Sequence, residues 1–200
     1  MNFLAHARLS FGDPGVLVGN MISDFVKGRK KELFPDKIRQ GIYLHRCIDE
    51  YTDAHPATRE ARELFRPSYR LYCGAMMDVV YDHFLASDEA EFSDATLKQF
   101  AAEVYGTLRE FESWLPAPFA RMLPYMESQN WLYNYRQLSG VRSSFGGLVR
   151  RAAFLTDSEP AARILDENYE PLRNFYHQFW SDMKSFAWEQ YKGHKPEGEN

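Results

Sequence analysis

Apolar residues recur at three- and four-residue spacing along most of this 200-residue chain. That spacing places them on one face of an α-helix, whereas the alternating pattern of half-buried strands is scarce. Prolines and glycines divide the pattern into about eight or nine segments, for example at His55-Pro56 and at Gly12-Asp13-Pro14-Gly15. The sequence therefore predicts an all-α fold.

Length and composition favour one compact helical domain. The chain is 44% hydrophobic and contains 15 Phe and 12 Tyr, enough for a core rich in aromatic side chains. No internal repeat or Pro/Gly/Ser-rich linker divides it. We therefore expect a single domain over residues 1–191, followed by a frayed tail over residues 192–200.

Charge and hydropathy exclude several classes of protein. The net charge of −4 argues against general affinity for nucleic acid. The apolar runs are far shorter than the roughly 20 residues needed to cross a bilayer. The two cysteines form no CxxC motif, and no secretory hydrophobic segment precedes the first charges. We expect a cytoplasmic protein that binds neither nucleic acid nor membranes.

Three of the expected helices carry acids or histidines on otherwise apolar faces. In the helix over residues 36–53, two such polar side chains continue the apolar stripe, and the helices over residues 16–26 and 72–86 behave alike. A buried carboxylate is costly unless it is paired, hydrogen-bonded or bound to metal. The candidate metal ligands are Asp24, His45, Asp49, Asp78 and Asp82.

Converging acids would repel one another unless a cation neutralises them, and helical bundles build metal sites in this way. A carboxylate-rich ligand set without a thiolate pair suits Mn²⁺, Mg²⁺ or Fe²⁺ better than structural zinc. Such an ion lowers the pKa of bound water and neutralises phosphoryl charge, which predicts a hydrolase. The alternative is a salt-bridge network through Arg46 that holds the same acids without metal.

The same regions carry a pattern that resembles the acyl carrier protein phosphodiesterase family. Its elements are Met1-Asn2-Phe3-Leu4-Ala5-His6, Gly19-Asn20 with Asp24-Phe25-Val26, His45-Arg46 with Ile48-Asp49, and Asp82-His83-Phe84-Leu85. The resemblance is strong in the first half of the chain and limited to helical character after about Ser139. It implies hydrolysis of the phosphodiester that joins 4′-phosphopantetheine to a serine of holo acyl carrier protein. It also implies metal dependence with Mn²⁺ favoured, and a helical fold distantly related to the HD-domain phosphohydrolases.

One departure from the HD pattern leaves the ligand assignment open. The adjacent His-Asp pair of that superfamily is replaced by His45-Arg46, with Asp49 one turn later. The reversed pair Asp82-His83 cannot direct both side chains to one point from a helix, and Asp82 is the expected ligand of the two.

Three further residues are candidates for catalytic roles. His6 and His83 are expected to protonate the departing serine oxygen, because an imidazole near its ordinary pKa donates a proton at neutral pH. Alternatively, His6 packs the first helix and His83 orients Asp82. Arg46 is expected to stabilise charge on the phosphoryl oxygens, or else to pair with an acid of its own helix.

A stripe of arginines predicts a surface for the acidic carrier protein. Arg59, Arg62 and Arg66 follow at i, i+3 and i+7 on the helix after Pro56, and Arg70 extends them. Such a stripe would attract an acidic partner by long-range electrostatics, and salt would screen that attraction. The alternative is a solvated helix face with intrahelical Glu/Arg pairs.

Two other functions fit the same residues. One keeps the metal and changes the substrate, giving a phosphohydrolase that acts on nucleotides or another small phosphodiester. The other is a noncatalytic helical module that binds acyl carrier protein and keeps the polar cluster as a salt-bridge network. The second alternative predicts no stoichiometric metal.

Overall fold

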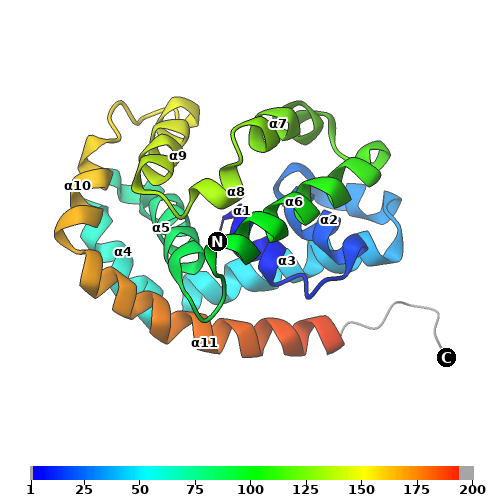
Figure 1. Cartoon of the computed structure of the whole chain (residues 1–200), viewed down its shortest axis with the longest axis horizontal. Coiled ribbons are helices and arrows are strands. Elements are labelled where there is room, and N and C mark those ends of the chain that lie inside the picture. The colour runs from blue at the N-terminus through cyan, green and yellow to red at the C-terminus, as the bar shows by residue number, and fades with distance from the viewer. Residues whose placement is uncertain (1, 194–200) are drawn as a thin grey trace.

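The computed structural model describes residues 2–193, which form eleven α-helices and four short 3-10 helices (Figure 1). The α-helices are α1 (Phe3–Arg8), α2 (Pro14–Ile22), α3 (Asp36–Ala54), α4 (Pro56–Tyr69), α5 (Cys73–Ser87), α6 (Asp94–Glu110), α7 (Ala117–Ser128), α8 (Trp131–Asn134), α9 (Leu138–Arg151), α10 (Glu159–Glu167) and α11 (Tyr169–Gly193). The 3-10 helices are η1 (Ser23–Phe25), η2 (Gly28–Leu33), η3 (Arg70–Tyr72) and η4 (Glu112–Trp114). The prediction of an all-α fold is confirmed.

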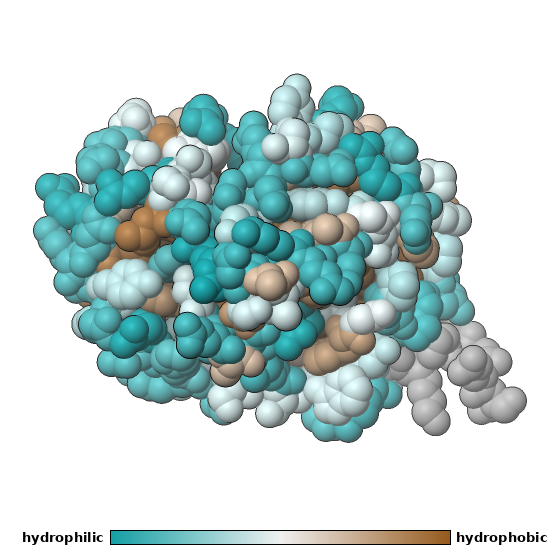
Figure 2. Space-filling view, in the orientation of Figure 1, coloured by the Kyte–Doolittle hydropathy of each residue, from teal (hydrophilic) through white to brown (hydrophobic). Residues whose placement is uncertain are grey.

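The helices enclose one hydrophobic core, and α11 runs along one edge of the molecule against α3, α4 and α5 (Figure 1). Aromatic side chains fill much of this core, as expected: Tyr81 stacks on Phe179 with 4.8 Å between ring centroids. Hydrophilic residues cover most of the face in Figure 2, and hydrophobic residues occupy scattered patches. None of the helices within residues 2–193 combines the length and apolar character needed to cross a membrane.

Two glycines allow α2 and α3 to cross with their backbones in contact. A Cβ atom on Gly19 would lie 2.0 Å from the carbonyl oxygen of Ile38, and one on Gly41 would lie 2.2 Å from that of Val16. No larger residue fits at either position without moving a helix. The crossing brings the end of α2 beside the middle of α3, where the functional site lies.

Several element boundaries differ from the sequence prediction. The expected helix over residues 16–26 ends at Ile22 and tightens into η1, so Asp24 lies outside the α-helix. Prolines and glycines were expected to divide the helices, but Pro67 lies inside α4, which ends where Arg70 adopts a positive φ of 45°. The glycines of α9 do not interrupt it. Helix α11 continues to Gly193, so the first two residues of the expected tail are helical, and residues 194–200 lie outside the described residues.

Candidate functional site

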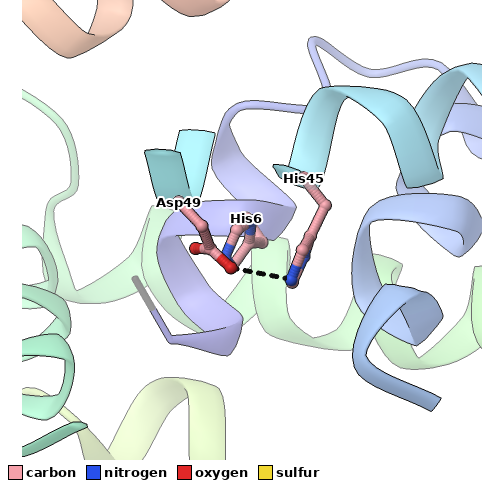
Figure 3. Close-up of side chains that lie close together, drawn as sticks. All are labelled: His6, His45 and Asp49. Atoms are coloured by element: carbon pink, nitrogen blue, oxygen red, sulfur yellow. Dashed lines mark ion pairs between the residues drawn. The ribbon is translucent and has the colours of Figure 1, made fainter. Parts of the chain in front are cut away.

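Two histidines and an aspartate meet between α1 and α3 (Figure 3). Each of His6, His45 and Asp49 offers one ligand atom, and these atoms all lie within 4.8 Å of one another. The imidazole rings stack with 3.9 Å between centroids and 16° between planes. Both histidines are buried, whereas the Asp49 side chain is 41% exposed. The cluster is therefore reached from solvent on its carboxylate side.

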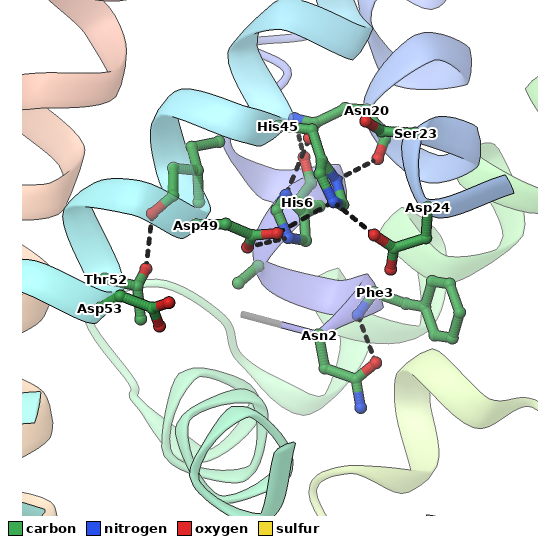
Figure 4. Close-up of polar contacts among 12 residues, drawn as sticks. Asn2, Phe3, His6, Asn20, Ser23, Asp24, His45, Asp49, Thr52 and Asp53 are labelled. Atoms are coloured by element: carbon green, nitrogen blue, oxygen red, sulfur yellow. Dashed lines mark hydrogen bonds and ion pairs between the residues drawn. The ribbon is translucent and has the colours of Figure 1, made fainter. Parts of the chain in front are cut away.

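Asn20 fixes the orientation of both rings (Figure 4). Its amide nitrogen donates to the carbonyl oxygen of His6 at 2.8 Å, so its amide oxygen faces Nδ1 of His6, also at 2.8 Å. The backbone carbonyl oxygen of Asn20 lies 2.8 Å from Nδ1 of His45. Because both of these oxygens only accept, each Nδ1 must carry the proton that it donates. The Nε2 atoms are then the free ends of both rings.

Both Nε2 atoms face carboxylates. His45 Nε2 lies 3.1 Å from Asp49 Oδ2 and 3.2 Å from Asp24 Oδ1. His6 Nε2 lies 3.2 Å from Asp49 Oδ1, yet it makes no hydrogen bond within residues 2–193. A neutral imidazole with a protonated Nδ1 presents a lone pair at Nε2, which a carboxylate oxygen repels. This arrangement requires a cation, either a proton or a metal ion, between the nitrogens and the oxygens.

The pKa values of the two histidines are shifted in opposite directions. Burial lowers the pKa of His45, but the hydrogen bonds to Asp24 and Asp49 outweigh it and bring the pKa to about 9. Burial, and then the neighbouring His45 charge, lower the pKa of His6 to about 4. The hydrogen bond to His45 also lowers the pKa of Asp24. Without another cation, the cluster holds one proton on His45 near neutral pH.

Asp82 lies apart from these contacts. Its two carboxylate oxygens accept from the backbone N–H groups of Leu4 at 2.8 Å and Ala5 at 3.1 Å, and the side chain is fully buried. These N–H groups lie in the first turn of α1 and have no acceptor within the helix. A negative charge is favoured at this end of a helix. Asp82 therefore anchors α1 to α5, and α1 carries His6. Its assignment as a metal ligand stays a prediction.

His83 and Arg46 also make contacts away from the three clustered side chains. His83 is buried, with Nδ1 2.8 Å from the carbonyl oxygen of Tyr135 and Nε2 3.0 Å from the hydroxyl of Tyr169. Both of its ring nitrogens thus join elements of the fold. Arg46 is exposed and donates to the carbonyl oxygen of Val26 at 3.3 Å. Within residues 2–193 it forms no ion pair, so the salt-bridge network proposed through Arg46 is not formed there.

A cavity of about 430 Å³ connects the cluster to part of the arginine stripe. Its lining includes Asp49 and Asp78 together with Arg62, Arg66 and Arg70. Burial raises the pKa of Asp78, so this carboxyl keeps a proton to higher pH than an exposed one. The cavity thus places acids from two helices beside positive charge from α4 and η3.

The arginines differ in their surroundings. Arg66 pairs with Glu63 at 2.7 Å, which is the intrahelical pairing expected of a solvated face. Arg62 is only 16% exposed and pairs with Asp53. Arg59 is exposed but does not line the cavity, whereas Arg70 is exposed and does. Three of the four arginines, Arg62, Arg66 and Arg70, therefore line the cavity that reaches Asp49, and Arg59 does not.

Sequence reasoning gave Asn20 no role. It lies in the Gly19-Asn20 pair beside the helix crossing, and it is fully buried. A buried amide next to an obligatory glycine is a signal that the backbone approaches closely and that the amide has a fixed partner. The sequence alone did not show that this partner is a histidine from another helix.

Comparisons with known proteins place these residues in a family. The family model described as acyl carrier protein phosphodiesterase matches residues 1–183. The acyl carrier protein phosphodiesterase of Escherichia coli O45:K1 (strain S88 / ExPEC) is 34% identical over 188 residues, which cover 94% of this chain and 97% of the relative. That of Enterobacter sp. (strain 638) is 32% identical over 184 residues, with 92% and 95% covered. No solved structure matches the chain significantly, so the relation to the HD-domain fold stays a prediction.

Proposed function

The chain belongs to the acyl carrier protein phosphodiesterase family, and we propose that it hydrolyses the phosphodiester between 4′-phosphopantetheine and the serine of holo acyl carrier protein. The observation that carries the proposal is the convergence of two imidazole Nε2 atoms on carboxylates in a partly open cluster. Such a cluster holds the cation that a phosphoryl group needs.

We propose that this cation is a divalent metal ion, with Mn²⁺ the first choice and Mg²⁺ or Fe²⁺ as alternatives. Ligands in adjacent positions around a six-coordinate ion lie about 3 Å apart when each bond is about 2.1 Å. His45 Nε2 lies 3.1 Å from Asp49 Oδ2 and His6 Nε2 lies 3.2 Å from Asp49 Oδ1, so each nitrogen is near that spacing from one of the two carboxylate oxygens. A set of two histidines and one carboxylate is typical of such ions, and the side chain of Asp24, 75% exposed, can add a second carboxylate. When bound, the ion would activate a water molecule and neutralise phosphoryl charge.

The protein residues around the ion then have distinct tasks. His6 and His45 hold it through Nε2, while Asn20 keeps both rings in the required tautomer. With its Nε2 engaged, His6 is a ligand in this proposal and no longer a proton donor. Asp78, which burial keeps protonated to higher pH, lines the same cavity as Asp49 and is the proposed donor to the departing serine oxygen.

The carrier protein itself is proposed to dock over Arg66 and Arg70, because these two exposed arginines border the cavity that reaches Asp49. An acidic protein would be drawn to them, with a dependence on salt. A cytoplasmic location is part of the proposal, since both cysteines are free thiols that a reducing compartment preserves.

The test is direct. Purified protein is incubated with Mn²⁺ and holo acyl carrier protein, and mass spectrometry follows the loss of the phosphopantetheine mass. We expect conversion to the apo form, its arrest by EDTA, and its loss in His45→Ala and Asp49→Ala. Arg121→Glu, an exposed substitution on α7, serves as the control that retains activity. An unchanged mass of the carrier protein in the presence of Mn²⁺, Mg²⁺ and Fe²⁺ would refute the proposed function.

A further inference from the structure

A second cavity lies on the other side of the first turn of α1. It measures about 320 Å³, within the range of about 300–1,000 Å³ typical of small-molecule sites. Its walls come from the start of α1, from α5, from the α7–α8 junction and from one face of α9. None of its lining residues belongs to the histidine–carboxylate cluster or to the arginine-lined cavity.

This cavity adjoins the cluster through α1 and α5. Asn2 and Phe3 line it, and the backbone N–H of His6 donates to the carbonyl oxygen of Asn2 at 3.3 Å. The wall residue Asn2 therefore lies one helical turn before His6 on α1. On α5, Val79 lines this cavity while its neighbour Asp78 lines the arginine-lined one. Adjacent residues of α5 thus line the two cavities, and the first turn of α1 lies between the second cavity and His6 in the sequence.

The lining suits a neutral polar chain more than a bare hydrocarbon. Amide side chains and hydroxyl groups alternate there with apolar walls such as Trp131. Asn2 uses its amide oxygen to cap α1, and its NH₂ group makes no hydrogen bond within residues 2–193 (Figure 4). Gln129 accepts from the Trp131 indole, and its NH₂ group is likewise unused among the described residues. These groups are donors that the carbonyl oxygens of a ligand's amides would satisfy.

We propose that this cavity binds the pantetheine arm, a chain with two amides and a terminal thiol, while the cluster holds its phosphate. The inference rests on the proposed function, since it assigns a place to one part of that substrate. Serine and carrier protein then lie toward the arginine-lined cavity, and the arm lies on the opposite side of α1. Arg150 and Arg151 at the end of α9 line the same cavity and add positive charge that would attract a substrate whose phosphate is anionic.

Gly147 gives the sharpest test of this assignment. It lines the cavity from the middle of α9, and a Cβ atom there would meet only the end of the Arg150 side chain, at 3.8 Å. Gly147→Leu therefore fills the cavity without a backbone clash, and leucine favours a helix more than glycine does. Gly106→Leu on α6 is the matched control, because a Cβ atom there would meet nothing within 4 Å.

Two readouts separate the arm site from the chemistry. Binding of free pantetheine and 4′-phosphopantetheine is measured by calorimetry. KM is measured with holo acyl carrier protein and with bis(p-nitrophenyl) phosphate, a diester that has no arm. We expect Gly147→Leu to weaken the binding of both ligands by at least about tenfold. The increase in KM for the carrier protein should exceed the increase in KM for the small diester by a similar factor. Gly106→Leu should match the wild type.

The failures are distinguishable. If the wild type cleaves holo acyl carrier protein and Gly147→Leu keeps wild-type affinity for pantetheine, the arm lies elsewhere and the proposed function stands. If the wild type binds pantetheine but does not cleave the carrier protein, the cavity assignment survives while the proposed function fails. Thermal unfolding verifies that the variant folds. If it does not, Ser143→Leu replaces it. Among the described residues the Ser143 hydroxyl donates only to Ser139 of its own helix, and Ser143 lines the same cavity.

Discussion

Replacing Asp82 should mainly lower the stability of the protein, whereas replacing Asp49 should mainly lower its affinity for Mn²⁺. Asp82→Ala removes the carboxylate that accepts hydrogen bonds from two backbone N–H groups, and it leaves these buried donors of Leu4 and Ala5 without partners. Hydrogen bonds to a charged group are worth about 1.5–3 kcal/mol each, so the sum is about 3–6 kcal/mol. Burial raises the pKa of Asp82 to about 7 in spite of these bonds, so the carboxylate is partly protonated near neutral pH and the lower end of that range applies.

A loss of about 3 kcal/mol lowers the Tm of a chain this long by about 6–12 °C. The assay pairs thermal unfolding with Mn²⁺ titration by calorimetry at a temperature where every variant is folded. Asp82→Ala should show the lower Tm and keep measurable Mn²⁺ binding. Without metal, Asp49→Ala should lower the Tm less than Asp82→Ala does, because Asp24 still pairs with His45. Its Mn²⁺ affinity should fall by more than the roughly 10–100-fold that is typical of changes outside the ligand set. An Asp82→Ala variant with the wild-type Tm and no Mn²⁺ binding would make Asp82 a ligand and overturn the assignment of an anchor.

Three further outcomes test the crossing, the cluster and the docking surface. Gly41→Ala places a Cβ atom 2.2 Å from a backbone oxygen of α2 and should cost about 1–3 kcal/mol of unfolding free energy in denaturant titrations; an unshifted midpoint would show that the helices separate freely. In EDTA, the raised pKa of His45 contributes stability on the order of 3 kcal/mol, which is present below pH 6.5 and is lost as pH rises through about 9. Mn²⁺ affinity should rise over the same pH range, because the metal displaces the proton on His45. A flat affinity between pH 6.5 and 9 would count against His45 as a ligand. Arg66→Glu with Arg70→Glu should raise KM for the carrier protein and weaken its salt dependence, whereas Arg121→Glu should not; an unaltered KM at low salt would leave the stripe as a solvated face.

The apolar periodicity predicted the helices well because burial, more than local propensity, decides where a helix forms. The breaks were harder to predict. Pro67 ends no helix: it lies two residues before the end of α4, and the packing of that helix outweighs the lost N–H donor and the clash of the ring with the preceding turn. The boundary between α10 and α11 falls at Asn168, and Pro171 lies in the first turn of α11, where a missing N–H donor is tolerated. A proline thus marks the start of one helix here and lies inside another at Pro67, and the sequence pattern alone does not distinguish the two cases.

The site could be predicted in part for the same reason. His45 and Asp49 share a face of α3, so their spacing alone placed them together, and the structure has them 3.1 Å apart. His6 was singled out, but as a proton donor, because nothing within α1 indicates which residue its Nε2 atom faces. Asp24 was placed on a helix face, yet it reaches His45 from η1 with its side chain largely exposed. Residues on one element were predictable, and contacts between elements were not.

Asp82 shows why a helical pattern cannot assign the role of an inward acid. Asp49 and Asp82 both continue an apolar face, and each needs a positive partner. For Asp49 that partner includes the imidazoles of the cluster. For Asp82 it is the backbone of α1, 77 residues away in sequence, and no side chain marks those donors. A helix of six residues has little stability alone, so this anchor helps to decide where His6 points. Asp82 thus influences the cluster by positioning α1, and its replacement should lower activity through the loss of folded protein, while the protein that remains folded still binds Mn²⁺.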